Sequence, residues 1–488
     1  MKDYLRQGAP DYSQSTKEYT TWAYSATYDG WYQTLDENGK YIRLENSPKT
    51  PIAVTSKESL REYKDAGFNT LMINYVFPVQ DFERFSTSRT KQIMDWAHEV
   101  GLKCFIFENL LRKLAATTES LINPEKANGR TFFRTQEELN EFVYIRIKDM
   151  IKHPAFYGFS IFDEPPYTMF PAFGQLYKAL QAARPGTYLC MNLLGLAGKP
   201  TSSILKYCEN AENLSFTEGF TKYITHYADC TGAPYLQVDV YPFRGSKEKP
   251  FLTNGTIRTP QFLANFCKER DMKLHYVLQT SAFSVGFGDA VLPWLRTPTE
   301  RELHWQAHIT MAFGVTSFSY WNYYPVVNTA SEHYDEKSTF LDLAGNKNDT
   351  YYYMQALHKQ MQSMAKTILN FRYQGSRVFV KGTPKGNTAH LEVEFFEREF
   401  ARPVTVEAGE NSAFLVNELY DKEKGYYGYY IVNAADPFYE NEGTVSLTFT
   451  GFDRIQVCDQ RGTENKQIEG GRLSVTLKTG EGIFVIPY

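Results

Sequence analysis

The sequence FYGFSIFDEPPY (Phe156–Tyr167) joins a run without charge to two adjacent carboxylates and two prolines. A run that is apolar at nearly every position favours a β-strand buried on both faces, as in a parallel sheet. Pro165 and Pro166 have no N–H to donate, so a central strand must end before them. We therefore expect Asp163 and Glu164 to lie at the carboxyl end of a buried parallel strand.

Seven similar runs flank this one, and segments with helical spacing separate them. Ser56, for example, is expected to cap the helix that follows the first run. Eight buried strands alternating with helices predict an α/β fold, a (β/α)8 TIM barrel, in which catalytic groups gather at the carboxyl ends of the strands. The other predicted strands are Thr20–Tyr28, Phe68–Phe77, Leu102–Leu110, Gly186–Gly195, Tyr235–Phe243, Lys273–Phe283 and Val315–Pro325.

The pattern changes after the helical segment Tyr351–Leu369. Short runs of alternating apolar and polar residues follow, separated by turns rich in Gly, Asn and Asp. This pattern predicts an antiparallel β-sandwich. We therefore expect a catalytic barrel over residues 1–370 and a C-terminal β-sandwich over residues 371–488.

The composition excludes several classes of partner. The net charge is −4 and no basic run occurs, so neither nucleic acid nor an anionic membrane is expected. No stretch is apolar enough to span a membrane. The start MKDYLRQGAP lacks the apolar core of a signal peptide, which favours the cytoplasm, or the periplasm or secretion if a signal has been removed. The six cysteines form no C-x-x-C pair and are expected to be reduced core thiols.

The paired carboxylates suit general acid catalysis. A neighbouring negative charge and partial burial raise the pKa of one carboxyl group, so that it stays protonated near neutral pH. Aromatic residues make up 16% of the chain, and ring faces can stack on sugar rings. The alternative is a structural pair that caps the strand end or binds an Arg or Lys.

Three segments resemble bacterial (β/α)8 glycoside hydrolases of the clan A type. HPAFYGFSIFDEPP (His153–Pro166) is similar to their fourth strand, LQVDVYPF (Leu236–Phe243) to their sixth and WQAHITMAFGVTSFSYWNYYP (Trp305–Pro325) to their eighth. The ending LKTGEGIFVIPY (Leu477–Tyr488) is typical of their terminal sandwich. The resemblance spans most of the barrel. It implies a role in carbohydrate metabolism, an oligo- or polysaccharide substrate and no cofactor or metal.

The resemblance also implies roles for individual residues. The proton donor of these enzymes maps onto Glu164, but their nucleophilic glutamate at the end of strand seven maps onto Gln279, and an amide cannot be the nucleophile. The second carboxylate could be Asp239, the leading candidate, or Glu108. Alternatively, as in hexosaminidase-like enzymes, Asp163 orients a substrate acetamido group that replaces the nucleophile. The third alternative is a barrel that binds carbohydrate without cleaving it.

Polar and aromatic side chains near other strand ends are candidates for substrate binding, with core packing as the alternative. The His304–His308 pair lacks the H-E-x-x-H pattern, so no metal site is expected. The sequence leaves open the sugar, the linkage, the stereochemical outcome and the oligomeric state. The substrate-binding candidates are Trp321, Tyr241, Gln279, Asn192, Asn74, Glu108 and Tyr24.

Overall fold

The structure of the chain is a computed structural model. It describes residues 8–27, 32–35, 41–43, 55–73, 85–196, 208, 213–246, 248–253, 255–287, 290–325, 332–335, 337–342, 344–393 and 399–488.

Eight parallel strands form one sheet that closes into a nearly complete barrel, as the sequence predicts. Their order is β1-β14-β11-β8-β7-β6-β5-β4. The two end strands adjoin where the N–H of Asn69, before β4, donates to the carbonyl of Thr21 in β1 (3.2 Å). The strands are β1 (Thr20–Ala23), β4 (Thr70–Ile73), β5 (Lys103–Phe107), β6 (Phe156–Asp163), β7 (Tyr188–Leu193), β8 (Tyr235–Asp239), β11 (Lys273–Gln279) and β14 (Val315–Trp321).

By its internal contacts the chain divides into two compact units. One consists of residues 1–20, 240–318 and 352–488, and the other of residues 21–239 and 319–351. The barrel strands are therefore distributed over both units. The domain boundary expected near residue 370 stays a prediction.

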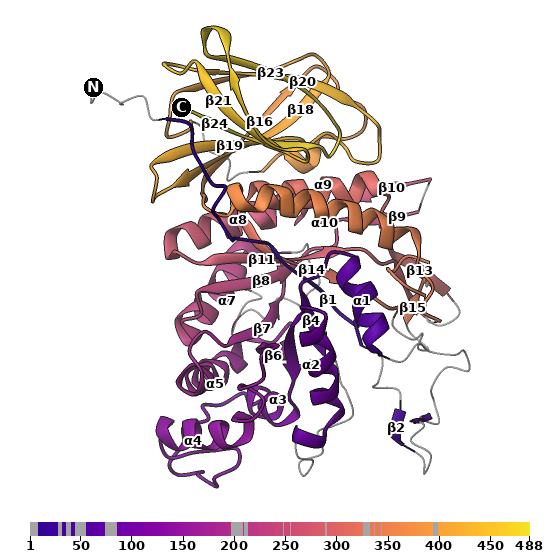
Figure 1. Cartoon of the computed structure of the whole chain (residues 1–488), viewed down its shortest axis with the longest axis vertical. Coiled ribbons are helices and arrows are strands. Elements are labelled where there is room, and N and C mark those ends of the chain that lie inside the picture. Colours follow the sequence, from indigo (N-terminus) through magenta and orange to yellow (C-terminus); the bar gives the residue numbers. More distant parts are fainter. Residues whose placement is uncertain are drawn as a thin grey trace. The chain divides into compact units, whose positions relative to one another are not determined.

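The second unit holds strands β4 to β8 and the helices that alternate with them. Figure 1 shows α2, α5 and α7 running alongside these strands. Ser56 caps α1 in a capping box with Ser59, as predicted, and Ser215 caps α7 in the same way with Glu218. The helices are α1 (Lys57–Asp65), α2 (Arg89–Glu99), α3 (Asn109–Ala115), α4 (Gln136–Ile147), α5 (Phe170–Ala183) and α7 (Phe216–Thr231), with short segments η2 (Phe85–Thr87), η3 (Tyr167–Met169), β2 (Tyr32–Leu35), β3 (Tyr41–Arg43) and β15 (Glu332–Tyr334).

The first unit holds β11 and the helices and hairpins next to it in sequence. Strands β9 and β10 pair in one antiparallel hairpin, and β12 and β13 pair in another. All six cysteines are free thiols; four are buried as expected (Cys104, Cys190, Cys267 and Cys458), whereas Cys208 and Cys230 are only half-buried. The elements are β9 (Phe243–Gly245), β10 (Pro250–Leu252), α8 (Gly255–Arg270), β12 (Phe283–Phe287), β13 (Ala290–Leu295), α9 (Glu300–Ala312) and α10 (Asp349–Ile368).

The C-terminal part of the first unit is the predicted β-sandwich. A six-stranded sheet in the order β16-β18-β19-β24-β21-β22 faces a three-stranded sheet, β17-β20-β23. Side chains from both sheets, among them Val416, Tyr429 and Leu447, form one buried core. The elements, in yellow tones in Figure 1, are β16 (Arg372–Lys381), η5 (Ala389–Leu391), β17 (Val404–Ala408), β18 (Ser412–Asp421), β19 (Tyr426–Asn433), β20 (Glu442–Phe449), β21 (Arg454–Asp459), β22 (Gly462–Gln467), η6 (Glu469–Gly471), β23 (Arg472–Lys478) and β24 (Gly482–Pro487).

Glu108 ties two helices of the second unit together. It is the N-cap of α3, where one carboxylate oxygen accepts a hydrogen bond from the N–H of Leu111 (2.7 Å). The other oxygen accepts from Nε and Nη2 of Arg146 in α4 (2.9 and 2.7 Å). The Glu108 side chain is fully buried, so these contacts replace the water that the charge would otherwise need.

The close packing of β6 against β7 predicts that Gly158 tolerates no side chain. A Cβ atom at this position would lie 2.0 Å from the carbonyl oxygen of Tyr188. We expect Gly158→Ala to lower the free energy of unfolding by about 3 kcal/mol, measured by urea denaturation, because backbone atoms cannot yield as a flexible side chain does. Gly8→Ala is the control, since no atom lies within 4 Å of its Cβ position. Equal stability of the two variants would contradict this packing.

The contacts of Glu108 predict a large structural effect. Glu108→Ala leaves Arg146 without its partner and α3 without its cap, so we expect a loss of about 3 kcal/mol in the free energy of unfolding. Glu58→Ala, which removes an exposed pair with Arg61, should change stability by less than about 1 kcal/mol. A Glu108→Ala protein of unchanged stability would show that these contacts do not support the fold.

Candidate functional site

Three polar side chains occupy matching positions on three neighbouring strands of the barrel. Asp163 of β6 pairs in register with Asn192 of β7, which pairs in register with Gln237 of β8. Partners in register point to the same face of a parallel sheet, so the three form one row near the carboxyl ends of the strands. The Nδ2 of Asn192 donates to Oδ1 of Asp163 (2.9 Å), and this bond orients the carboxylate.

The strand that carries the acid pair departs from regular geometry just before it. The register of β6 against β7 shifts by one residue between Ser160 and Phe162, so β6 has one more residue here than its neighbour. Such a bulge re-aims the side chains that follow it. The bulge could not be predicted from the sequence pattern, because apolar residues continue through it.

Glu164 adopts a backbone conformation that is unfavourable for its residue type. Its φ is +44°, in the left-handed region, where a side chain other than that of glycine is strained. The following Pro165 disfavours helical conformations at this position as well. The N–H of Glu164 donates to the carbonyl of Asn192 (2.8 Å), which holds the conformation. Strain of this kind costs roughly 1–3 kcal/mol, persists only where the surroundings impose it, and is concentrated at functional sites.

Tyr24, directly after β1, lies close to two carboxylates. Its hydroxyl accepts a hydrogen bond from Nε2 of Gln237 (3.3 Å), and its ring centroid is 5.2 Å from that of Trp321. Burial raises the pKa of Tyr24 well above its usual value, and the charges of Asp163 and Asp239 raise it further. The hydroxyl therefore stays protonated at neutral pH and lies within the electrostatic reach of both acids.

The end of β14 adds an aromatic ring and an amide. Trp321 is half-buried and is joined to Asn322 by a cis peptide bond. Asn322 is fully buried, and its Oδ1 accepts a hydrogen bond from the hydroxyl of Ser25 (3.3 Å). Gln237, Asn322 and Ser25 were not predicted as site residues. For Gln237 a signal existed, because it lies two residues before Asp239 and so shares its strand face.

Three amide atoms of this cluster have no hydrogen-bond partner among the residues that the structure describes. They are Oδ1 of Asn192, Oε1 of Gln237 and Nδ2 of Asn322. All three side chains are buried, and buried polar atoms are nearly always paired with protein or with ordered water. The cluster therefore has unused hydrogen-bonding capacity that water or a hydroxyl group can satisfy.

Gln279, predicted to bind substrate, uses its amide group within the protein. It is fully buried, and its Oε1 accepts from the N–H of Phe243 (2.9 Å). Its Nε2 donates to the carbonyls of Phe243 (3.1 Å) and Arg296 (2.8 Å). Both N–H groups are thus engaged, as are both carboxylate oxygens of Glu108. A contact of either residue with substrate stays a prediction from the sequence.

The remaining predicted residues differ in what the structure describes. Asp239 is the last residue of β8 and is half-buried. Tyr241 is also half-buried and lies two residues beyond the end of β8, so strand alternation does not place it on the same face as Asp239. Asn74 lies outside the described residues.

Neither a metal cluster nor a membrane helix is found in the described part of the chain. No three His, Cys, Asp or Glu side chains there come together in a way that could hold a metal ion. His308 instead shares a hydrogen bond with the hydroxyl of Tyr430 (2.8 Å), and burial lowers its pKa to about 3. Of the described helices, none has the length and apolar character needed to cross a membrane.

No protein-family model matches the sequence, and no curated protein sequence matches it. Solved structures of glycoside hydrolases are similar to the chain at low identity. A family 39 glycoside hydrolase from Bacteroides cellulosilyticus WH2 is 12% identical, with a TM-score of 0.43, over 90% of this chain and 79% of its own. An α-amylase from Anoxybacillus is 11% identical, with a TM-score of 0.48, over 96% and 97%. A family 30 endoxylanase from Clostridium papyrosolvens C71 is 13% identical, with a TM-score of 0.41, over 97% of each chain.

Proposed function

We propose that the protein is a glycoside hydrolase in which Glu164 donates the proton to the departing oxygen. The observation that carries the proposal is the backbone of Glu164. It is held at a φ of +44° by its bond to the Asn192 carbonyl, at the end of a barrel strand and directly after a bulge. Strained backbone of this kind is concentrated at functional sites, which favours an active-site role for Glu164 over a purely capping one.

Asp239 is the second carboxylate of the proposal. Gln279 has no carboxylate to offer, and both oxygens of Glu108 are engaged by Arg146 and the α3 N-terminus. Asp239 ends β8 two residues after Gln237, so it shares the strand face of the row formed by Asp163, Asn192 and Gln237. In this role Asp239 attacks the anomeric carbon or activates the water that does so, and Glu164 protonates the leaving group.

The other side chains of the site bind and orient. Asp163 is held by Asn192 and accepts a hydrogen bond from a substrate hydroxyl group. In the substrate-assisted alternative it orients an acetamido group instead. The rings of Trp321 and Tyr24 meet at 5.2 Å and offer apolar surface to the C–H face of a sugar. Asn192 contributes its unpaired Oδ1 as an acceptor for a hydroxyl.

Glu164→Gln tests the proton donor. We expect a loss of about 10²–10⁴-fold in kcat/KM on 4-nitrophenyl glycosides, because the amide cannot protonate the leaving oxygen. The loss should be much smaller on 2,4-dinitrophenyl glycosides, whose leaving group needs little protonation. Glu119→Gln, an exposed surface change, is the control. A uniform loss on both substrates would contradict the role. A wild type that binds sugar but cleaves no aryl glycoside would favour the non-catalytic barrel.

Asp239→Asn tests the second carboxylate. If Asp239 is the nucleophile or base, the variant should lose at least about 10²-fold in kcat, measured under saturating substrate. In the substrate-assisted alternative Asp239→Asn keeps its activity, Asp163→Asn loses it, and only 2-acetamido-2-deoxy glycosides are cleaved. The pair of variants therefore separates the two mechanisms.

A further inference from the structure

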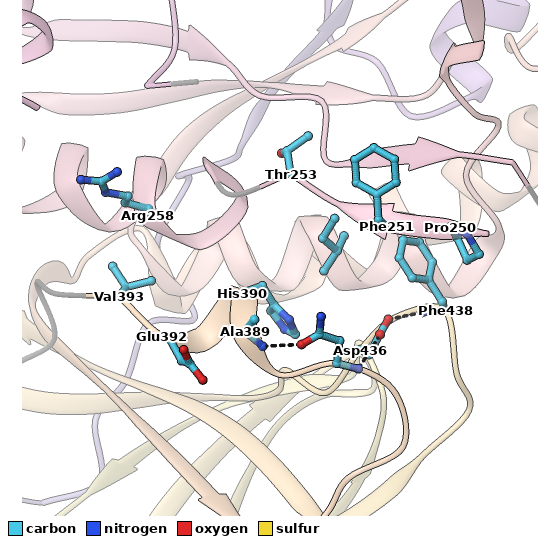
Figure 2. Close-up of a pocket in the computed structure, with 12 residues that line it drawn as sticks. Pro250, Phe251, Thr253, Arg258, Ala389, His390, Glu392, Val393, Asp436 and Phe438 are labelled. Atoms are coloured by element: carbon cyan, nitrogen blue, oxygen red, sulfur yellow. Dashed lines mark hydrogen bonds between the residues drawn. The ribbon is translucent and has the colours of Figure 1, made fainter. Parts of the chain in front are cut away.

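A second candidate site lies in the first unit, whereas Asp163, Asn192 and Gln237 belong to the second. A cavity of about 290 Å³ opens between the strand β10 with the start of α8 and the loops at residues 387–393 and 436–438. Figure 2 shows side chains from both sides facing it. Every residue that lines it belongs to the first unit.

The loop on the sandwich side of the cavity is fixed by helix α9. Nε of Arg301 donates to the carbonyl of Pro437 (2.9 Å), and its Nη2 donates to the carbonyl of Phe438 (3.2 Å). One turn further along the helix, Nε1 of Trp305 donates to the carbonyl of Ala435 (3.0 Å). Three bonds from one helix hold four residues of loop in place, so the wall is preformed, as is usual for ligand sites.

A buried carboxylate joins the two loops. Asp436 is only 5% exposed, and its oxygens accept hydrogen bonds from the N–H groups of Asn387 (2.9 Å) and Phe438 (3.0 Å). Next to it a ring nitrogen of His390 contacts the carbonyl of Ala434 (2.9 Å). Burial lowers the pKa of His390, so its imidazole is neutral at pH 7. Figure 2 shows both side chains at the cavity.

The charges around the cavity do not favour an ionic ligand. Arg258 supplies one positive charge, and Glu392 and Asp436 supply negative ones. A phosphate would meet two carboxylates, and a polycation would meet the guanidinium. The lining thus suits a neutral ligand with many hydroxyl groups, to which the carboxylates and the guanidinium can hydrogen-bond.

Two aromatic rings add apolar surface to this polar lining. Phe251 of β10 lines the cavity although 56% of the residue is exposed. Phe438 also lines the cavity, and the guanidinium of Arg296 lies 4.7 Å from its ring centroid, a cation–π contact that helps to hold the ring. Flat apolar rings beside hydroxyl-binding groups match the amphipathic faces of a sugar ring.

We propose that this cavity binds one sugar unit of a polysaccharide without cleaving it. The volume lies at the lower end of the range for small-molecule sites, which limits the bound portion to about one ring. Its described lining residues belong to another unit than Glu164, and the cavity would hold a polymer whether or not the barrel cleaves it. The exposed ring of Phe251 contributes the stacking surface, and Glu392 accepts hydroxyl hydrogen bonds.

Native affinity electrophoresis tests the proposal, with xylan, galactan, galactomannan or mixed-linkage β-glucan cast in the gel. All proteins carry Glu164→Gln, so that cleavage does not alter the polymer. We expect at least one polysaccharide to slow the parent protein and Phe251→Ala and Glu392→Ala to weaken that binding about fivefold or more. Tyr352→Ala is the matched control, because its ring is 55% exposed and does not line the cavity.

Three results would overturn the proposal: no retardation by any of the four polymers, retention of full affinity in both cavity variants, or equal weakening by Tyr352→Ala. Thermal unfolding of each variant verifies that it is folded, and both cavity changes are on exposed side chains. Glycosidase activity of the protein without Glu164→Gln is a separate measurement. The two proposals can therefore fail independently. Absence of polysaccharide binding at the cavity would not contradict the role of Glu164, and absence of glycosidase activity would not contradict binding at the cavity.

Discussion

Strand β7 holds the acid pair at the end of β6 through a single residue, Asn192. Its side chain binds the carboxylate of Asp163, and its carbonyl receives the N–H of Glu164. The prolines that follow cannot donate to a neighbouring strand. The chain is also held where it leaves the barrel by the hydroxyl of Tyr223, which donates to the carbonyl of Pro165 (2.7 Å). The side chain of Asn192 thus orients the carboxylate of Asp163, and its carbonyl supports the strained backbone of Glu164. The proposed chemistry relies on both contacts.

Two of the predicted site residues, Glu108 and Gln279, use their polar atoms in hydrogen bonds within the protein. A carboxylate or amide at a strand end is useful to a substrate only if the fold leaves its polar atoms unpaired. Glu108 stands where β5 runs directly into α3, and the first turn of that helix takes one of its oxygens. Gln279 meets the backbone at Phe243 and Arg296, which saturates its donors. Asn192 and Gln237 each keep one amide oxygen unpaired among the described residues. Each can therefore offer an acceptor to a substrate, whereas the polar groups of Glu108 and Gln279 are engaged within the protein.

Much of the architecture could be predicted from the sequence, because a strand that is buried on both faces appears there as a continuous apolar run. The apolar runs located the eight strands, and the change to alternation located the sandwich. The prolines located the end of β6. The bulge after Ser160 and the left-handed Glu164 could not be read, since an extra residue in an apolar run leaves that run apolar. Nor could the partners of Gln279, which lie 36 and 17 residues away. Such contacts depend on tertiary packing rather than on local pattern.

The positive φ of Glu164 has an evolutionary consequence. Glycine adopts this conformation freely, so a chain selected only to fold would gain from losing the side chain at this position. In the proposed mechanism, the stability lost at this position is the cost of keeping the proton donor, a trade-off known from active sites. Related chains with glycine here would then be expected to keep the barrel but lack the proposed activity.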